Sequence, residues 1–193
     1  MATALPADGL LDADTYLARL GEDEPRQELI HGRIVMMTGG RRANFALSAQ
    51  LLIALGTRLA GKPCRPYGDG AFIRIDDANL LSPDVFVDCA PFDPEPRFFE
   101  APVLIAEVLS ESTEARDRNE KWRLYRRLPS LRHYLLVARS ERRIEHYARD
   151  GEVWRYEDLT GDAELRLDAL DITLPLTEVY AGIVEDVPGA ASD

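Results

Sequence analysis

One charged residue interrupts an otherwise apolar stretch of the chain. Residues 103–110 read VLIAEVLS, which is typical of a buried β-strand, and Glu107 lies in the middle of it. Moving an isolated carboxylate out of water is costly unless the group is paired, protonated or bound to a metal. Two more charged residues occupy costly positions: Asp84 opens the apolar stretch PDVFVDC, and Lys121 lies on the apolar face of a predicted helix. These three are the candidate functional residues.

Their types and spacing suit a metal-dependent reaction. Two carboxylates on adjacent strands form a natural site for Mg²⁺, which prefers oxygen ligands and keeps several of its waters. Lys121 shares its helix face with the apolar positions three, four and seven residues later. A helix packed on the sheet would therefore bring the ammonium towards Glu107, where it could orient or deprotonate an attacking water.

Two other interpretations use the same residues. A buried ion pair between the carboxylates and Lys121 could be purely structural, although buried ion pairs are weak evidence for stability. A glycosidase also uses two carboxylates. It would normally need more aromatic platforms and a larger scaffold than this chain offers, so the sequence disfavours it.

The elements that must position these residues alternate between helices and strands. Hydrophobic periodicity and turn residues predict them. The predicted elements are a helix at 12–20 begun by an Asp cap, a hairpin at 26–38 turning at His31-Gly32, a helix at 43–59, strands at 65–75, 83–89 and 102–110, a surface loop at 90–102, a helix at 118–128 closed by Pro129, a strand at 132–138, and a hairpin at 142–159 around Asp150-Gly151. The order indicates an α/β or α+β domain.

Length and composition set limits on the function. The 193 residues fit one domain, no apolar run is long enough to span a bilayer, and the start lacks a secretion signal, so we expect a cytoplasmic protein. Cys64 and Cys89 form neither a CxxC pair nor a disulfide framework and are expected to be reduced thiols. The three histidines lack the spacing of a zinc site.

The charge distribution gives a mixed signal about nucleic acid. The net charge of -11 is not typical of a nucleic-acid-binding protein. Local arginine clusters are nevertheless candidate phosphate contacts, with a solvated helix face as the alternative for each. The candidates are Arg41, Arg42, Arg116, Arg118 and Arg123.

Five segments together resemble a known family. QELIHGRIV, SPDVFVDC, PVLIAEVLS, DRNEKWRLYRRLPS and RHYLLV occur in the order found in the putative restriction endonuclease family, a branch of the PD-(D/E)XK nuclease superfamily. The resemblance spans about residues 12–183. It implies a restriction-endonuclease-like core, a mixed β-sheet flanked by helices, with extra N-terminal and C-terminal β-hairpins. We expect a single domain over residues 1–185 and a flexible tail at 186–193.

The resemblance also implies an activity and roles for particular residues. It implies Mg²⁺-dependent cleavage of DNA, with Mn²⁺ as a possible substitute, and a homodimer is plausible because cutting both strands requires two sites. Asp84 matches the PD half-motif, and Glu107 matches the acidic residue of (D/E)XK, with the Val108 carbonyl as a further metal ligand. Glu28 matches an additional acidic position, with an exposed hairpin glutamate as its alternative interpretation.

The chain departs from the family pattern at two positions. Leu109 stands where the standard motif has lysine, and Lys121 on the following helix matches the lysine that this branch supplies instead. Many relatives carry a histidine near the start of the long helix, where this chain has Asn44. Two rivals therefore stay open: a weakly active or inactive nuclease-fold module that binds or assembles, and a phosphodiesterase acting on RNA or nucleotides.

Overall fold

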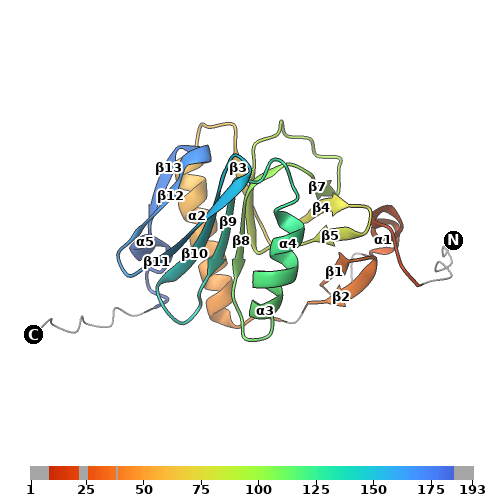
Figure 1. The fold of residues 1–193 in the computed structure, drawn as a ribbon, viewed down its shortest axis with the longest axis horizontal. Coiled ribbons are helices and arrows are strands. Elements are labelled where there is room, and N and C mark those ends of the chain that lie inside the picture. The colour runs from red at the N-terminus through yellow and green to blue at the C-terminus, as the bar shows by residue number, and fades with distance from the viewer. Residues whose placement is uncertain (1–8, 22–25, 38, 185–193) are drawn as a thin grey trace, which may run out of the picture.

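The computed structural model describes residues 9–21, 26–37 and 39–184 (Figure 1), so the predicted tail at 186–193 lies outside the described residues. The helices are α1 (Ala13–Arg19), α2 (Arg42–Leu59), α3 (Glu114–Arg116), α4 (Trp122–Tyr125) and α5 (Leu176–Val179), with a π-helical turn at Asp117–Lys121 and a 3₁₀ turn at Asp168–Leu170. The strands are β1 (Gln27–Ile30), β2 (Arg33–Met36), β3 (Arg65–Gly68), β4 (Phe72–Asp76), β5 (Asn79–Leu81), β6 (Val85–Asp88), β7 (Phe98–Phe99), β8 (Pro102–Val108), β9 (His133–Val137), β10 (Arg143–Asp150), β11 (Val153–Thr160), β12 (Glu164–Leu167) and β13 (Ile172–Pro175).

A mixed sheet of six strands, in the order β11-β10-β9-β8-β6-β3, forms the centre of the fold. Only β8 and β9 run parallel within it, and the helical segment from α3 to α4 makes the crossover that parallel neighbours need. α2 lies on one face of the sheet and α4 on the other (Figure 1). Leucines of α2 and apolar residues of α4 pack against the strands from these two sides. This arrangement confirms the predicted class, a mixed sheet flanked by helices.

A second sheet of five strands, β2-β1-β5-β4-β7, lies beside the first, and β12 and β13 form a separate hairpin. The N-terminal hairpin is confirmed: β1 and β2 turn at His31 and Gly32, whose φ angles of 51° and 74° are those of a tight hairpin turn. The C-terminal hairpin is confirmed by the pairing of β10 with β11 from Asp150 and Val153 onwards.

Three predicted elements differ from the observed ones. The strand predicted at 65–75 is two strands, β3 and β4, in different sheets, because the chain turns between them where Gly70 has a φ of +95°. The predicted surface loop at 90–102 contains β7, which pairs with β4. The helix predicted to reach Pro129 ends at Tyr125, and turn hydrogen bonds such as Leu128 N to the Tyr125 carbonyl replace its last turn.

The prediction of reduced thiols is wrong, because Cys64 and Cys89 form a disulfide. The ladder of β3 and β6 pairs Arg65 with Asp88, so the two flanking cysteines meet just beyond it. Disulfides are typical of oxidising compartments and do not support the cytoplasmic expectation. Among the described residues, no helix is long and apolar enough to cross a membrane.

Removing the disulfide is expected to lower the free energy of unfolding. Cys64 and Cys89 are 25 residues apart, and cross-linking a loop of that size stabilises a domain by about 3 kcal/mol. Urea unfolding of the Cys64→Ala/Cys89→Ala variant measures the loss. A reducing agent should shift the unfolding midpoint of the wild type and leave the variant unchanged. Equal midpoints for the reduced and oxidised wild type would contradict the prediction.

Candidate active site

Asp84 and Glu107 lie side by side because two antiparallel strands place them there. β6 pairs with β8 so that Val85 is opposite Ala106, which brings the residue before β6 next to Glu107. The Asp84 carboxylate accepts a hydrogen bond of 2.7 Å from the Val108 amide. Glu107 itself is only 3% exposed and shares a face of β8 with Ile105, towards the crossover helix.

Lys121 reaches Glu107 from the π-helical turn before α4. Its ammonium nitrogen lies 3.0 Å from Glu107 Oε1, and the side chain is buried. The helical spacing predicted this approach, and the distance confirms it. The standard motif has a lysine where this chain has Leu109. Lys121, fourteen residues after Glu107, supplies an ammonium beside Glu107 instead.

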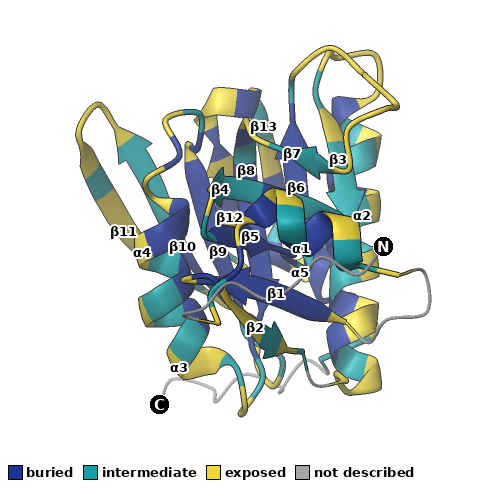
Figure 2. Cartoon of the chain, turned by 90° about the vertical axis from the view of Figure 1, so that its right-hand side faces the viewer, coloured by how far each residue is buried: buried dark blue, intermediate teal, exposed yellow. Residues whose placement is uncertain are grey.

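Glu28, on β1 of the second sheet, also contacts the Lys121 ammonium. Its Oε1 lies 3.0 Å from the Lys121 ammonium and accepts a hydrogen bond of 3.0 Å from the Ser82 amide. At 1% exposure, Glu28 is not the exposed hairpin glutamate of the alternative interpretation. All of β1 is buried, whereas β2 is largely exposed (Figure 2).

Two further residues of the site were not assigned from the sequence. The Tyr125 hydroxyl donates a hydrogen bond of 3.0 Å to Glu107 Oε1, and Asp117 Oδ1 lies 3.7 Å from the Lys121 ammonium. They stand four positions after and four positions before Lys121, which puts all three on one helix face. That spacing was the signal available in the sequence.

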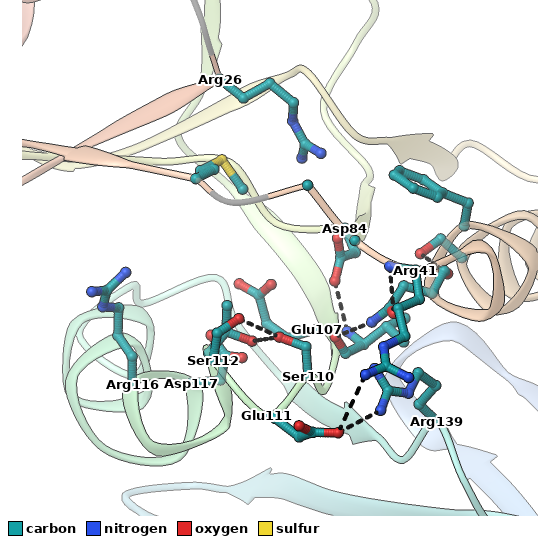
Figure 3. A pocket seen from close by; sticks show the side chains of 18 of the residues that line it. Arg26, Arg41, Asp84, Glu107, Ser110, Glu111, Ser112, Arg116, Asp117 and Arg139 are labelled. Carbon is teal, nitrogen blue, oxygen red and sulfur yellow. Dashed lines mark hydrogen bonds and ion pairs between the residues drawn. The ribbon is translucent and has the colours of Figure 1, made fainter.

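An open cavity of about 340 Å³ lies over the site, and its rim carries arginines (Figure 3). Its lining includes Glu28, Asp84, Glu107, Asp117 and Lys121. Of the predicted phosphate contacts, Arg41 and Arg116 line the cavity. Arg42, Arg118 and Arg123 lie outside its lining, and the Arg118 guanidinium is paired with Glu145. Two further arginines, Arg26 and Arg139, line the cavity and were not assigned as phosphate contacts from the sequence.

Comparison with known proteins identifies the family. Residues 13–177 match the model of Uma2, described as putative restriction endonuclease. The chain belongs to this family. Two proteins of Synechocystis sp. (strain ATCC 27184 / PCC 6803 / Kazusa) are similar to it: Uncharacterized protein slr1290 is 32% identical over 177 residues, covering 90% of this chain and 93% of the relative, and Uncharacterized protein sll1609 is 31% identical over 180 residues, covering 84% and 96%.

A solved structure shares the fold of this Uma2-family protein. A putative nuclease belonging to DUF820 from Anabaena variabilis ATCC 29413 superimposes with a TM-score of 0.72 at 17% identity, covering 88% of this chain and 97% of that chain. At this identity the likeness shows the fold alone. The nuclease-like function is supported by the family match.

Burial dominates the electrostatics of the Uma2-type site. It raises the pKa values of Glu107, Asp84 and Asp117, and Lys121 offsets only part of that effect. Burial alone would lower the pKa of Lys121, but the carboxylates of Glu107, Glu28 and Asp117 outweigh it and leave that pKa raised. One ammonium therefore faces more carboxylates than it can neutralise.

Asn44 holds the end of β8 against the start of α2. Its amide nitrogen lies 3.3 Å from both the Val108 and Leu109 carbonyl oxygens, and its side-chain oxygen accepts a hydrogen bond of 3.2 Å from the Arg41 amide. Asn44 thus contacts the same backbone carbonyl that the resemblance implies as a metal ligand.

The donor set suits a hard divalent cation. The described residues contain no group of three or more His, Cys, Asp or Glu side chains arranged to hold a metal ion by themselves. Mg²⁺ needs fewer protein ligands, because it keeps several waters and often binds through one or two carboxylates. Asp84, Glu107 and the Val108 carbonyl supply that number. Asp117 Oδ1 is buried without a hydrogen-bond partner, and its ion pair with the Lys121 ammonium is long, at 3.7 Å.

Proposed function

We propose that this protein is a Mg²⁺-dependent endonuclease that hydrolyses DNA phosphodiester bonds. The observation that carries the proposal is the position of the Lys121 ammonium, which lies 3.0 Å from Glu107. Position 109, where the standard motif has lysine, is a leucine in this chain. A buried lysine that meets one carboxylate could be a structural ion pair. Here the pair lines a cavity rimmed by arginines, beside a second carboxylate, Asp84.

Each residue has a distinct role in the proposed reaction. When bound, Mg²⁺ would be held by Asp84, Glu107 and the Val108 carbonyl and would supply positive charge to the pentacoordinate transition state. Because its pKa is raised, Lys121 stays protonated, so it donates a hydrogen bond to the attacking water and stabilises negative charge rather than acting as the base.

The surrounding residues fix that geometry. The Tyr125 hydroxyl holds Glu107 Oε1, and burial raises the pKa of this phenol well above its usual value, so the hydroxyl keeps the proton it donates. Glu28 and Asp117 hold the Lys121 ammonium in place and keep it charged. Such positioning by neighbouring side chains is what a reaction between oriented groups requires.

The arginines of the rim are the proposed contacts to the DNA backbone. Arg41 and Arg139 share Glu111, at 3.9 Å and 3.1 Å, and Arg116 lies across the cavity from them (Figure 3). Guanidinium groups suit phosphate because they bind it through two parallel hydrogen bonds. Phosphate contacts position DNA without reading its sequence. The local charge explains how an acidic chain could bind DNA.

A plasmid assay tests the proposal. Wild type is expected to nick supercoiled DNA in Mg²⁺ or Mn²⁺ at low salt and to be inactive in EDTA. Asp84→Asn and Glu107→Gln are each expected to lose about 100-fold or more in rate, since each loses charge at the metal site. Asp88→Asn, at the opposite end of β6, is the matched control and should keep its activity. Equal rates for wild type and Glu107→Gln would overturn the site assignment.

One observation favours a second candidate, a nuclease-fold module without catalysis. Asn44 already donates to the Val108 carbonyl that the metal would use. The net charge of -11 points the same way. In that case neither plasmid nor single-stranded RNA would be cleaved, and calorimetry would detect no Mg²⁺ binding. Cleavage of RNA but not DNA would instead identify the RNA phosphodiesterase.

A further inference from the structure

β11 forms an outer edge of the six-stranded sheet, and within the described chain its outer side pairs with no other strand (Figure 2). It is eight residues long, and most of its residues are exposed, including Val153 at 62% and Tyr156 at 51%. A long exposed edge is a template for another strand, and natural proteins usually shorten, bend or cover such edges. β11 is neither short nor interrupted by a bulge, and no other strand of the described residues covers its outer side.

The ladder with β10 shows which backbone groups of β11 are free to pair. The Gly161 amide donates to the Arg142 carbonyl at 3.0 Å, and hydrogen-bonded pairs alternate along an antiparallel ladder. Odd-numbered residues of β11 therefore direct their amide and carbonyl groups towards β10. The groups of Trp154, Tyr156 and Asp158 point outward, ready to bond to a further strand.

We propose that β11 pairs antiparallel with β11 of a second copy of this chain, with Tyr156 opposite Tyr156 of the partner subunit. This register aligns the outward amides and carbonyls of the two strands as hydrogen-bonded pairs. It places Arg155 opposite Glu157 of the partner subunit, and by symmetry Glu157 opposite the partner's Arg155. Val153 then faces the partner's Leu159. The central sheets of the two copies become one continuous sheet.

The charges of β11 select this register over its neighbours. Sliding the strands by one step of the ladder in one direction puts Arg155 opposite itself, and sliding them the other way puts Glu157 opposite itself. Like charges directly opposite are unfavourable, whereas opposite charges stabilise the pair. Edge charges usually prevent association. Here the opposite signs two positions apart favour a single alignment with an identical strand.

Charge reversal tests the register. Arg155→Glu and Glu157→Arg each place like charges opposite one another twice, so each variant is expected to raise the dimer dissociation constant about tenfold or more. Mixing the two variants restores opposite charges at both contacts and should restore the dimer. The double variant Arg155→Glu/Glu157→Arg should also dimerise like wild type. Light scattering across a concentration series measures each mass, and Arg166→Glu on β12 is the control reversal.

A cross-link gives a second readout that does not depend on charge. The two native cysteines already form a disulfide, so a new cysteine has no thiol partner within its own chain. Tyr156→Cys should form a disulfide-linked dimer on mild oxidation, because residues opposite each other across strands lie within bonding range. Trp154→Cys, whose proposed partner is position 158, should cross-link at least about tenfold more slowly.

The outcomes separate the parts of the proposal. A wild type that stays monomeric up to about 100 µM would overturn it. A wild-type dimer insensitive to both single reversals would place the interface elsewhere. Variants that dissociate but do not recover on mixing, or equal cross-linking at positions 154 and 156, would overturn the register. None of these measurements depends on nuclease activity.

Discussion

Replacing Lys121 with methionine is expected to lower the cleavage rate about 100-fold or more and to destabilise the fold by about 3–5 kcal/mol at pH 7. The ammonium is the shared partner of Glu107, Glu28 and Asp117, which are all buried. Without it these three buried carboxylates lie close together with no positive charge between them. Removing one partner of a buried ion pair leaves an uncompensated charge, which is why the effect is large.

The stability of the Lys121→Met variant should depend steeply on pH. The pKa values of Glu107, Asp84 and Asp117 are already raised in the folded protein, and in each case Lys121 opposes the rise. Without the lysine they rise further. A carboxyl group whose pKa is higher in the folded than in the unfolded state contributes its full stabilisation below its unfolded-state pKa, which is about 4. That stabilisation is lost as the pH rises through the folded-state pKa. The variant should therefore lose more stability than wild type between about pH 5 and 8.

The chain offers a matched control for this experiment. Lys62 and Lys121 are its only lysines, and Lys62 donates to the Leu170 and Asp171 carbonyls at the far end of α2. Lys62→Met makes the same chemical change at a more exposed position and should keep its cleavage rate and most of its stability. Thermal unfolding in EDTA between pH 5 and 8 gives the comparison. Equal pH dependence in the two variants would contradict the central role of Lys121.

Much of the candidate site could be predicted because its signals are local. Apolar runs marked β6 and β8 as buried strands, so Asp84 and Glu107 stood out against their neighbours. The helical spacing placed Lys121 on the face that packs against the sheet. Each of these inferences uses residues within one element, where periodicity of 2 or 3.6 determines the direction of a side chain.

What the sequence could not predict depends on contacts between distant segments. Glu28 is buried because a second sheet continues from β1 to β5, whereas the hairpin's own pattern is equally consistent with one exposed face. The disulfide of Cys64 and Cys89 forms because β3 turns back along β6. Such pairings follow from tertiary packing, which a window of a few residues does not contain.

The position of Asn44 was predictable in part: its helix follows from the local sequence, but its contacts do not. The helix around it was predicted, with its buried leucines on one face. Its contacts with the carbonyls of Val108 and Leu109 come from β8, about sixty residues away in sequence. The amide therefore bridges the end of the strand that carries Glu107. Its hydrogen bond competes with a metal for the Val108 carbonyl, which makes direct measurement of metal binding more informative than activity alone.

Mg²⁺ is expected to raise the thermal stability of wild type by an amount set by its affinity. A ligand that binds only the folded state adds about 4 kcal/mol when its free concentration is 1,000 times its dissociation constant. The physical reason is local, since a cation offsets the repulsion among Asp84, Glu107 and Asp117 that burial intensifies. Scanning calorimetry over a Mg²⁺ series, started from EDTA-treated protein, measures the shift.

Two variants on the same strand decide whether that stabilisation belongs to the proposed site. Asp84 directly precedes β6 and accepts a hydrogen bond from the Val108 amide. Asp88 is the last residue of β6 and accepts one from the Ala90 amide. Asp84→Asn removes a proposed ligand and should abolish the Mg²⁺-dependent shift, whereas Asp88→Asn should retain it. A shift that survives Asp84→Asn would place the cation elsewhere. If wild type shows no shift while remaining folded, the buried carboxylates and Lys121 constitute a structural ion cluster, and the non-catalytic interpretation prevails.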